Sequence, residues 1–114
     1  MLAAAVNSAE LELDPDLMLA IEDVNKSMSS NIALKSSKAA TADAKELTAM
    51  FATVETYFVQ KGGADNAVEL TQKSHDLTLE IVQFIADNNF DAASNSATKL
   101  ARTCKTCHTF YKKE

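Results

Sequence analysis

The chain has few of the residues that interrupt helices. Its 114 residues include two glycines, one proline and no tryptophan. Glycine and proline are the residues least favourable in a helix interior, and the plentiful alanine and leucine favour helices over a sheet. A chain of this length builds one domain with one modest hydrophobic core. We therefore expect an all-α fold in which residues 1–114 form a single domain.

Long apolar runs are also missing. No stretch of the chain reaches the roughly 20 apolar residues that a membrane-spanning helix needs, so we expect a soluble protein without membrane insertion. The opening segment Met1–Val6 lacks the basic start and the full apolar core of a secretory signal. Residues 1–13 are therefore a candidate for a loosely ordered leader, either the remnant of a signal or an added start.

The charge balance is acidic, with a formal net charge of −5. An acidic surface argues against nucleic acid or an anionic membrane as a partner and mildly favours a basic protein. The same charge also serves simply to keep a protein in solution. No histidine besides His108 is placed as an acid or base and no nucleophile constellation appears, so nothing in the sequence points to an enzyme.

The segment Cys104–His108 carries the clearest chemistry in the chain. It holds two thiols three residues apart, followed directly by an imidazole. At this spacing haem is attached covalently, because the thiols add to the two vinyl groups and the adjacent histidine reaches the iron as an axial ligand. On a helix, Cys104, Cys107 and His108 fall within about one turn and on one face. The motif predicts one covalently attached haem c.

Two other interpretations of these cysteines stay open as remote alternatives. A redox dithiol of the thioredoxin type lies at a helix N-terminus within a strand and helix pattern, whereas Cys104 and Cys107 lie near the C-terminal end of a predicted helix. A structural zinc site needs about four cysteine or histidine ligands, and His75 is the only further candidate.

The apolar residues recur at helical spacing in four segments. The first begins at Asp14–Pro15, an N-cap residue followed by proline, and is expected to run to residues 36–38. The second is expected to be capped by Thr41 and to end at Gly62–Gly63. The apolar stripe of the first contains Leu17, Ile21, Val24, Met28 and Ile32, and that of the second contains Leu47, Met50, Phe51, Val54 and Phe58.

The third segment opens at Asn66, which forms a capping-box pattern with Glu69, and breaks at Asn88–Asn89. Asp91 is the expected cap of the fourth segment, whose stripe leads into Cys104. Four amphipathic helices of similar length with short connections predict an antiparallel up-down-up-down four-helix bundle, with the haem motif near the end of the last helix.

The C-terminal segment resembles the signature of the class II c-type cytochromes, the cytochrome c′ family and its low-spin relatives. Arg102 precedes the first cysteine by two residues, and the aromatic pair Phe110 and Tyr111 follows the histidine. The chain is also similar in length and layout to the four-helix b-type cytochrome of the bacterial periplasm. The resemblance spans roughly residues 15–113 and depends mainly on the last helix. It implies a periplasmic haem protein, because covalent attachment of haem takes place outside the bacterial cytoplasm.

The resemblance leaves two functions open, which differ in what lies opposite the histidine. Low-spin members carry a methionine from the first helix and transfer electrons to a redox partner protein. Cytochromes c′ keep that position open, so the five-coordinate iron binds nitric oxide and other small gases. The positions to consider here are Met18, Val24 and Met28.

Helix geometry favours Met28 as the axial ligand opposite His108. If the first helix runs to residues 36–38, Met28 lies about 15 Å before its end, while His108 lies about 25 Å into the fourth helix, and the offset of about 10 Å suits two side chains that lean toward each other. Met18 starts deeper than His108 and points about 80° away from the apolar stripe. An ungapped comparison with the b-type bundle instead places Val24 nearest the ligand position.

Further residues are expected around the haem. Arg102 is placed to pair with a propionate or a partner, and Tyr111 to pack on the haem edge. The other expected pocket residues are Val24, Phe51, Val54, Phe58, Leu77, Ile81 and Leu100. A second face of the third helix carries Val68, Leu79 and Val82 beside an exposed, unligated His75, and this patch is a candidate contact for a homodimer.

Overall fold

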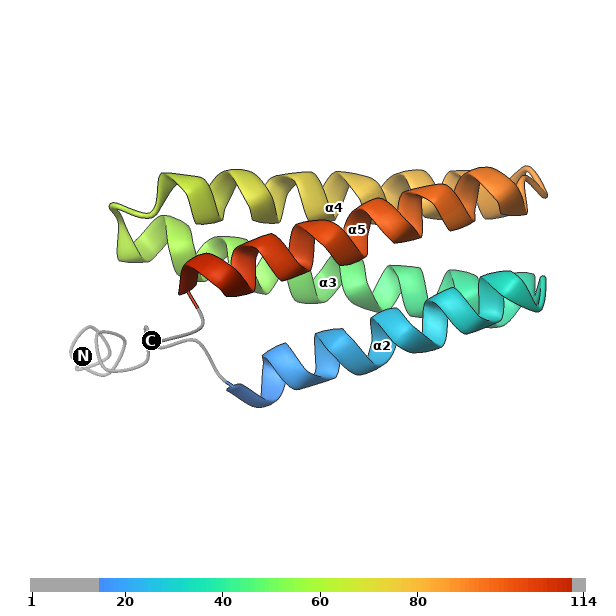
Figure 1. Cartoon of the computed structure of the whole chain (residues 1–114), viewed down its shortest axis with the longest axis horizontal. Helices are drawn as coiled ribbons and strands as arrows, with labels where there is room; N and C mark the ends of the chain where they lie inside the picture. Colours follow the sequence, from blue (N-terminus) through green and yellow to red (C-terminus); the bar gives the residue numbers. More distant parts are fainter. Residues whose placement is uncertain (1–14, 112–114) are drawn as a thin grey trace, which may run out of the picture.

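The computed structural model describes the backbone of residues 15–111 and the side chains of residues 16–105. It contains helices α2 (Pro15–Ala33), α3 (Ser37–Lys61), α4 (Asp65–Ala86) and α5 (Phe90–Tyr111). Each helix runs antiparallel to the one before it, and α5 returns beside α2 (Figure 1). This arrangement confirms the predicted all-α, up-down-up-down four-helix bundle. None of the helices in the described part of the chain is long and apolar enough to cross a membrane.

The core is built from the apolar stripes, because residues three and four apart share one helix face. In α3 this spacing buries Ala40, Ala44, Leu47, Phe51, Val54 and Phe58. The largest side chains that are fully buried in the bundle are Met28, Leu47, Ile81, Ile85 and Leu100. Each such side chain contributes about 1.5–3 kcal/mol by leaving water, so the stripes account for the packing of the four helices.

The end of α2 differs from the prediction. The helix ends at Ala33 and not at residues 36–38, because Lys35 adopts a left-handed conformation with φ of 57°. The Ser36 N–H bonds the Asn31 carbonyl and the Lys35 N–H bonds the Ile32 carbonyl, both at 2.9 Å. These two bonds form the Schellman motif that closes a helix. The motif usually has glycine at the left-handed position, and lysine gives no such signal in the sequence.

The starts of α3 and α4 also differ from the expected caps. Ser36 is the N-cap residue of α3, five residues before the predicted cap Thr41. Ala64 occupies the N-cap position of α4 in place of Asn66. The predicted end of α3 is confirmed, since Gly62 follows the last helical residue and its φ of 75° is one that glycine adopts without strain.

The N-cap residue of α5 differs from the expected one. The predicted break at Asn88–Asn89 is confirmed, with Asn88 left-handed at φ of 59° and α4 ending at Ala86. The Asn89 side-chain oxygen accepts a hydrogen bond from the Ala92 N–H at 3.2 Å, so Asn89, not Asp91, caps α5.

Polar side chains join neighbouring helices at fixed points. Asp43 of α3 accepts hydrogen bonds from Ser27 and Asn31 of α2, each at 2.8 Å. In the core, the Thr48 hydroxyl of α3 lies 2.8 Å from that of Thr78 in α4. Because each bond requires one axial position of the two helices, these contacts fix the register of α2 against α3 and of α3 against α4.

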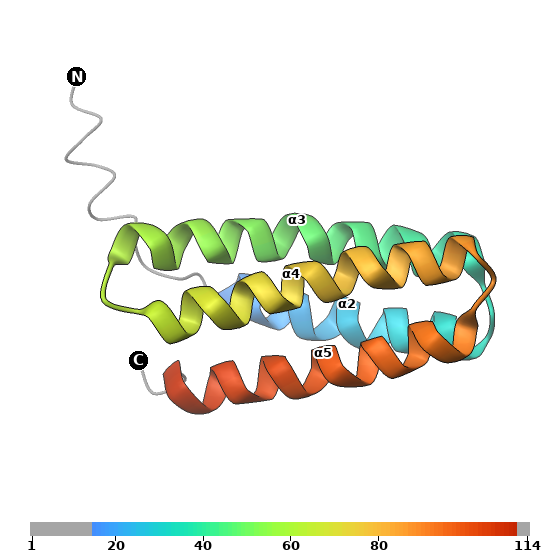
Figure 2. The same cartoon turned by 90° about the horizontal axis from the view of Figure 1, so that it is seen from above.

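The α2 and α5 pair is the most sparsely packed of the four neighbouring pairs in the described part of the chain. Viewed from above, the two helices draw apart toward the end of the bundle where α2 begins and α5 ends (Figure 2). The side of the bundle between α2 and α5 is therefore where the core is least tightly closed.

The second face of α4 does not form the expected apolar patch. Leu79 is exposed, but Val68 and Val82 are partly buried against the core. His75 is half-buried, so the prediction of an exposed histidine is wrong. Gln72, which shares this face at helical spacing, donates a hydrogen bond to Glu55 of α3 at 2.9 Å, so this face of α4 borders α3. A homodimer stays a prediction, but this face of α4 no longer supports it.

Candidate functional site

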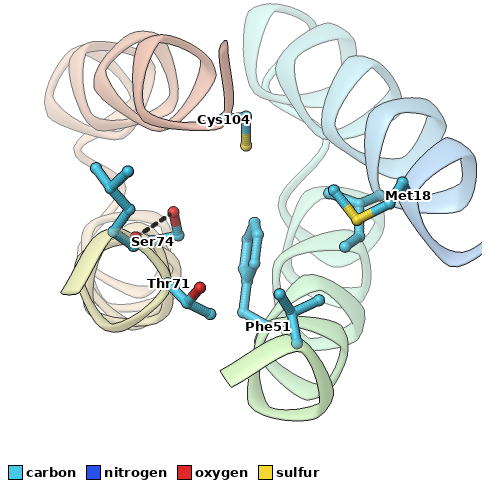
Figure 3. Close-up of a pocket in the computed structure, with 8 residues that line it drawn as sticks. Met18, Phe51, Thr71, Ser74 and Cys104 are labelled. Atoms are coloured by element: carbon cyan, nitrogen blue, oxygen red, sulfur yellow. Dashed lines mark hydrogen bonds between the residues drawn. The ribbon is translucent and has the colours of Figure 1, made fainter. Parts of the chain in front are cut away.

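A small cavity lies between the four helices at the level of Cys104 (Figure 3). Its volume is about 20 Å³. Every helix contributes to its wall, which consists of Met18, Ile21, Phe51, Val54, Leu70, Thr71, Ser74 and Cys104. The lining is apolar apart from two hydroxyls and two sulfur atoms. The cavity thus brings a thiol and a thioether together inside the bundle.

Cys104 reaches this cavity because it continues the buried face of α5. Ala93, Ala97 and Leu100 are buried, and Cys104 continues their spacing of three or four residues. Its side chain is half-buried, and Figure 3 shows it pointing into the space between the helices. The first cysteine of the predicted haem motif therefore faces the interior of the bundle.

Met18 lies across the cavity on α2. It is half-buried and packs against the core. Met18 lies 15 residues before the end of α2 at Ala33, and Cys104 lies 14 residues after the start of α5 at Phe90. At 1.5 Å per residue these are about 22 Å and about 21 Å from the loop end of the bundle, so the two sulfur-bearing residues lie at one level.

Met28 occupies a different environment from the one expected of a ligand. Its side chain is 0% exposed, and it does not line the cavity. Because α2 ends at Ala33, Met28 lies only five residues from that end, about 7.5 Å in place of the expected 15 Å. His108 lies 18 residues into α5, about 27 Å, so the offset between the two is about 20 Å. The helix end from which the expected offset was calculated is therefore wrong, and ligation of iron by Met28 stays a prediction. Of the two methionines, Met18 is the one that lines the cavity.

The other expected pocket residues divide into two groups. Phe51 and Val54 line the cavity. The remaining five are not in the cavity wall: Phe58, Leu77, Ile81 and Leu100 are buried in the core, and Val24 is partly buried against it. Four residues that do line it were not expected there, namely Ile21, Leu70, Thr71 and Ser74. Ile21 was predicted to belong to an apolar stripe, but the two hydroxyl residues were not.

The rest of the motif lies on the last turns of α5. Cys107, His108 and Tyr111 belong to this helix, but their side chains lie outside the described residues, and their roles stay predictions. Arg102 is exposed on α5, two residues before Cys104. Among the side chains of residues 16–105, no three carboxylate, cysteine or histidine groups converge on a common metal position, and His75 does not line the cavity.

The side chains that line the cavity suit a haem, but the cavity volume is too small for one. A cysteine thiol, a methionine thioether and an apolar wall are groups that surround a c-type haem with methionine and histidine ligation. However, about 20 Å³ holds about one water, whereas pockets for organic ligands measure roughly 300–1,000 Å³. A haem at this position therefore requires α2 and α5 to lie further apart, and these are the two helices with the sparsest contact.

In comparisons with known proteins, no family model matches this chain, and neither the curated proteins nor the solved structures gave a significant match. The functional assignment accordingly depends on the residues of the chain itself: the motif on α5, the cavity beside it and the methionine across from it.

Proposed function

We propose that this chain is a haem c protein that transfers electrons. The observation that carries the proposal is the position of Cys104, which faces an interior cavity between four helices within a motif suited to covalent haem attachment. In a dithiol or zinc module the thiols would need a helix N-terminus or further ligands. Cys104 instead lies 14 residues into α5, opposite an apolar wall.

Each residue then has a definite task. Cys104 and Cys107 hold the haem through thioether bonds, and His108 binds the iron on one side. Met18 supplies the second axial ligand, since it lies across the cavity from Cys104. The bound iron supplies one-electron redox chemistry, and a methionine ligand raises its reduction potential. Arg102, close to the motif on the exposed side of α5, pairs with a propionate or with the partner protein.

The bundle accommodates the group by packing around it. A haem bonded to the chain before the helices pack does not have to enter a finished cavity. Asp43 and the Thr48–Thr78 pair hold α2, α3 and α4 together, whereas α2 and α5 meet in the sparsest contact. Separation of α2 from α5 near Met18 therefore disturbs the fewest contacts.

The acidic surface suits a basic redox partner protein. A net charge of −5 becomes more negative with two haem propionates, and opposite charge on a partner accelerates encounter at low ionic strength. We place this exchange in the periplasm, because haem is attached covalently outside the bacterial cytoplasm.

The second candidate is a five-coordinate, cytochrome c′-like protein that binds nitric oxide or another small gas. The observation that favours it is the apolar wall formed by Ile21, Phe51 and Val54, whose side chains offer no ligand to iron. Under this alternative Met18 packs in the distal wall without binding the iron. Carbon monoxide binding by the reduced protein separates the two candidates.

The test of the haem assignment is extraction with acid acetone after expression with a haem attachment system. We expect the colour to stay with the wild-type protein, because thioether bonds survive loss of the fold and coordination alone does not. The double variant Cys104→Ala, Cys107→Ala should lose covalent haem.

Lys105→Ala is the matched control, since this exposed residue lies inside the motif and has no thiol that could form a thioether bond. It should retain haem as the wild type does. Haem that washes out of the wild-type protein would show that the assignment is wrong.

A further inference from the structure

Two hydroxyl groups stand out in the otherwise apolar cavity wall. Thr71 and Ser74 are each only 3% exposed, and both line the cavity beside Cys104. They lie three residues apart on α4, which places them on one helix face with about 5–6 Å between their Cβ atoms. Burial of a hydroxyl costs free energy unless its hydrogen-bonding capacity is used.

Their hydrogens are already used within the helix. The Thr71 hydroxyl donates to the Ala67 carbonyl at 2.7 Å, and the Ser74 hydroxyl donates to the Leu70 carbonyl at 2.9 Å (dashed line in Figure 3). A hydroxyl has one hydrogen and two acceptor lone pairs. Each oxygen therefore presents acceptor capacity to the cavity, and neither group has a second hydrogen to donate.

We propose that Thr71 and Ser74 hold one ordered water in this cavity by accepting its two hydrogens. The cavity volume of about 20 Å³ exceeds the roughly 10–15 Å³ that a single water needs. Two acceptors spaced by one helix turn suit a water that donates two hydrogen bonds of about 2.8 Å. The Cys104 sulfur, which lines the same cavity, is a weak third partner.

The arrangement has an electrostatic consequence that rests on the proposed haem function. Because both hydroxyl hydrogens point to helix carbonyls, Thr71 and Ser74 turn the negative ends of their dipoles toward the cavity. Negative dipole ends stabilise the more positive, oxidised state of a nearby iron centre and lower its reduction potential, as hydrogen-bonding groups around a haem generally tune it. Removal of the two oxygens should therefore raise the potential.

The water is tested first on the full chain without haem, by a high-resolution crystal structure and by water-to-protein nuclear Overhauser effects in solution. We expect density for one water within hydrogen-bond distance of both hydroxyl oxygens. Thr71→Val with Ser74→Ala should remove it, since valine keeps the shape of threonine without the oxygen. A wild-type map without this water, or a water that persists in the double variant, would overturn the proposal.

The consequence is tested on the haem-loaded chain by redox titration. The potential should rise in Thr71→Val and in Ser74→Ala, and further in the double variant. Thr56→Val is the matched control, because the Thr56 hydroxyl makes the same helical bond, to Ala52 at 3.0 Å, on the exposed side of α3.

The results of these two experiments can be told apart from a failure of the proposed haem function. A bridging water together with an unchanged potential would overturn the electrostatic consequence alone. Loss of haem in acid acetone would overturn the proposed function, while the water experiment would still stand because it needs no haem.

Discussion

Met18 and Met28 lie on the same helix in different surroundings. Substitution of Met28 should change mainly the free energy of unfolding, and substitution of Met18 should change mainly the haem spectrum. Met28 is 0% exposed within the core, and truncation of a fully buried methionine to alanine costs about 2–5 kcal/mol. Met18 is half-buried at the cavity, and loss of about half a buried side chain costs about 1 kcal/mol. The stability loss should therefore be largest for Met28→Ala.

These differences are large enough to measure by thermal unfolding. A domain of this size has a free energy of unfolding of about 5–15 kcal/mol, and each kcal/mol shifts the melting temperature by about 4 °C. Met28→Ala should lower it by about 8–20 °C, and Met18→Ala by about 4 °C. Both values refer to the chain without haem, because loss of the proposed bond from Met18 to iron would add to the cost of Met18→Ala in the haem-loaded protein.

The spectrum should respond in the opposite order. With Met18 as the sixth ligand, Met18→Ala should convert a low-spin protein to a high-spin form that binds carbon monoxide when reduced. The weak far-red band typical of methionine-to-iron charge transfer should vanish as well. Met28→Ala should keep the low-spin spectrum, because Met28 is a core residue about 15 Å along α2 from Met18.

Leucine variants control for a failure to fold. Exchange of methionine for leucine conserves volume and costs less than about 1.5 kcal/mol, yet removes the thioether. If Met18→Leu leaves the band intact and Met28→Leu abolishes it, the ligand is Met28, and the position of Met18 at the cavity does not make it a ligand. A wild type that is already high-spin and binds carbon monoxide would instead establish the five-coordinate, gas-binding function.

Two more predictions concern α5. His108→Ala should leave the haem attached through its thioethers but give a high-spin or solvent-ligated spectrum, since His75 is half-buried on α4 outside the cavity wall; an unchanged spectrum would contradict this role for His108. Asn89→Ala should lower the free energy of unfolding by about 1 kcal/mol, because Asn89 makes the capping bond. Asp91→Ala should lower it by only about 0.3–0.5 kcal/mol, because Asp91 acts through the helix dipole. Urea unfolding that shows the reverse order would contradict the capping assignment.

The helices themselves were predictable because their core residues are apolar at regular spacing. Leu47, Phe51, Val54 and Phe58 recur at intervals of three and four, and all four are buried in α3. Gly62 marks the end of the same helix with a residue type that signals it. Where composition and spacing both point to one structure, a single sequence is enough to place the element.

The end of α2 was not predictable on these grounds. Lys35 and Asn88 occupy equivalent left-handed positions after α2 and α4. Asparagine tolerates this conformation well, and the break at Asn88 was expected, whereas a lysine there costs free energy and carries no signal. A lysine conformation that the sequence does not signal therefore sets this boundary. The error of a few residues changed the axial distance of Met28 from the end of α2 from about 15 Å to about 7.5 Å.

The polar part of the cavity was missed for another reason. Ala67, Thr71, Ser74 and Thr78 continue the buried face of α4, but hydroxyl residues appear as interruptions of an apolar stripe. Their burial is tolerated because each hydroxyl donates to a nearby carbonyl of its own helix. Binary patterning treats a buried threonine and an exposed one alike, so the sequence gives no sign of acceptor oxygens inside the bundle.

Met18 was not expected in the cavity wall because a helix in a four-helix bundle has two flanks as well as a buried centre. Ser27 lies on the flank of α2 that bonds Asp43 of α3. Met18 lies nine residues earlier, which at 100° per residue is half a turn around the helix, on the flank toward Cys104 of α5. The angle of about 80° from the stripe, which seemed to exclude Met18, is the angle that a residue needs to face the gap between two neighbouring helices. Residues at the stripe centre, such as Met28, fill the core instead, so a group held between α2 and α5 is contacted from the flanks.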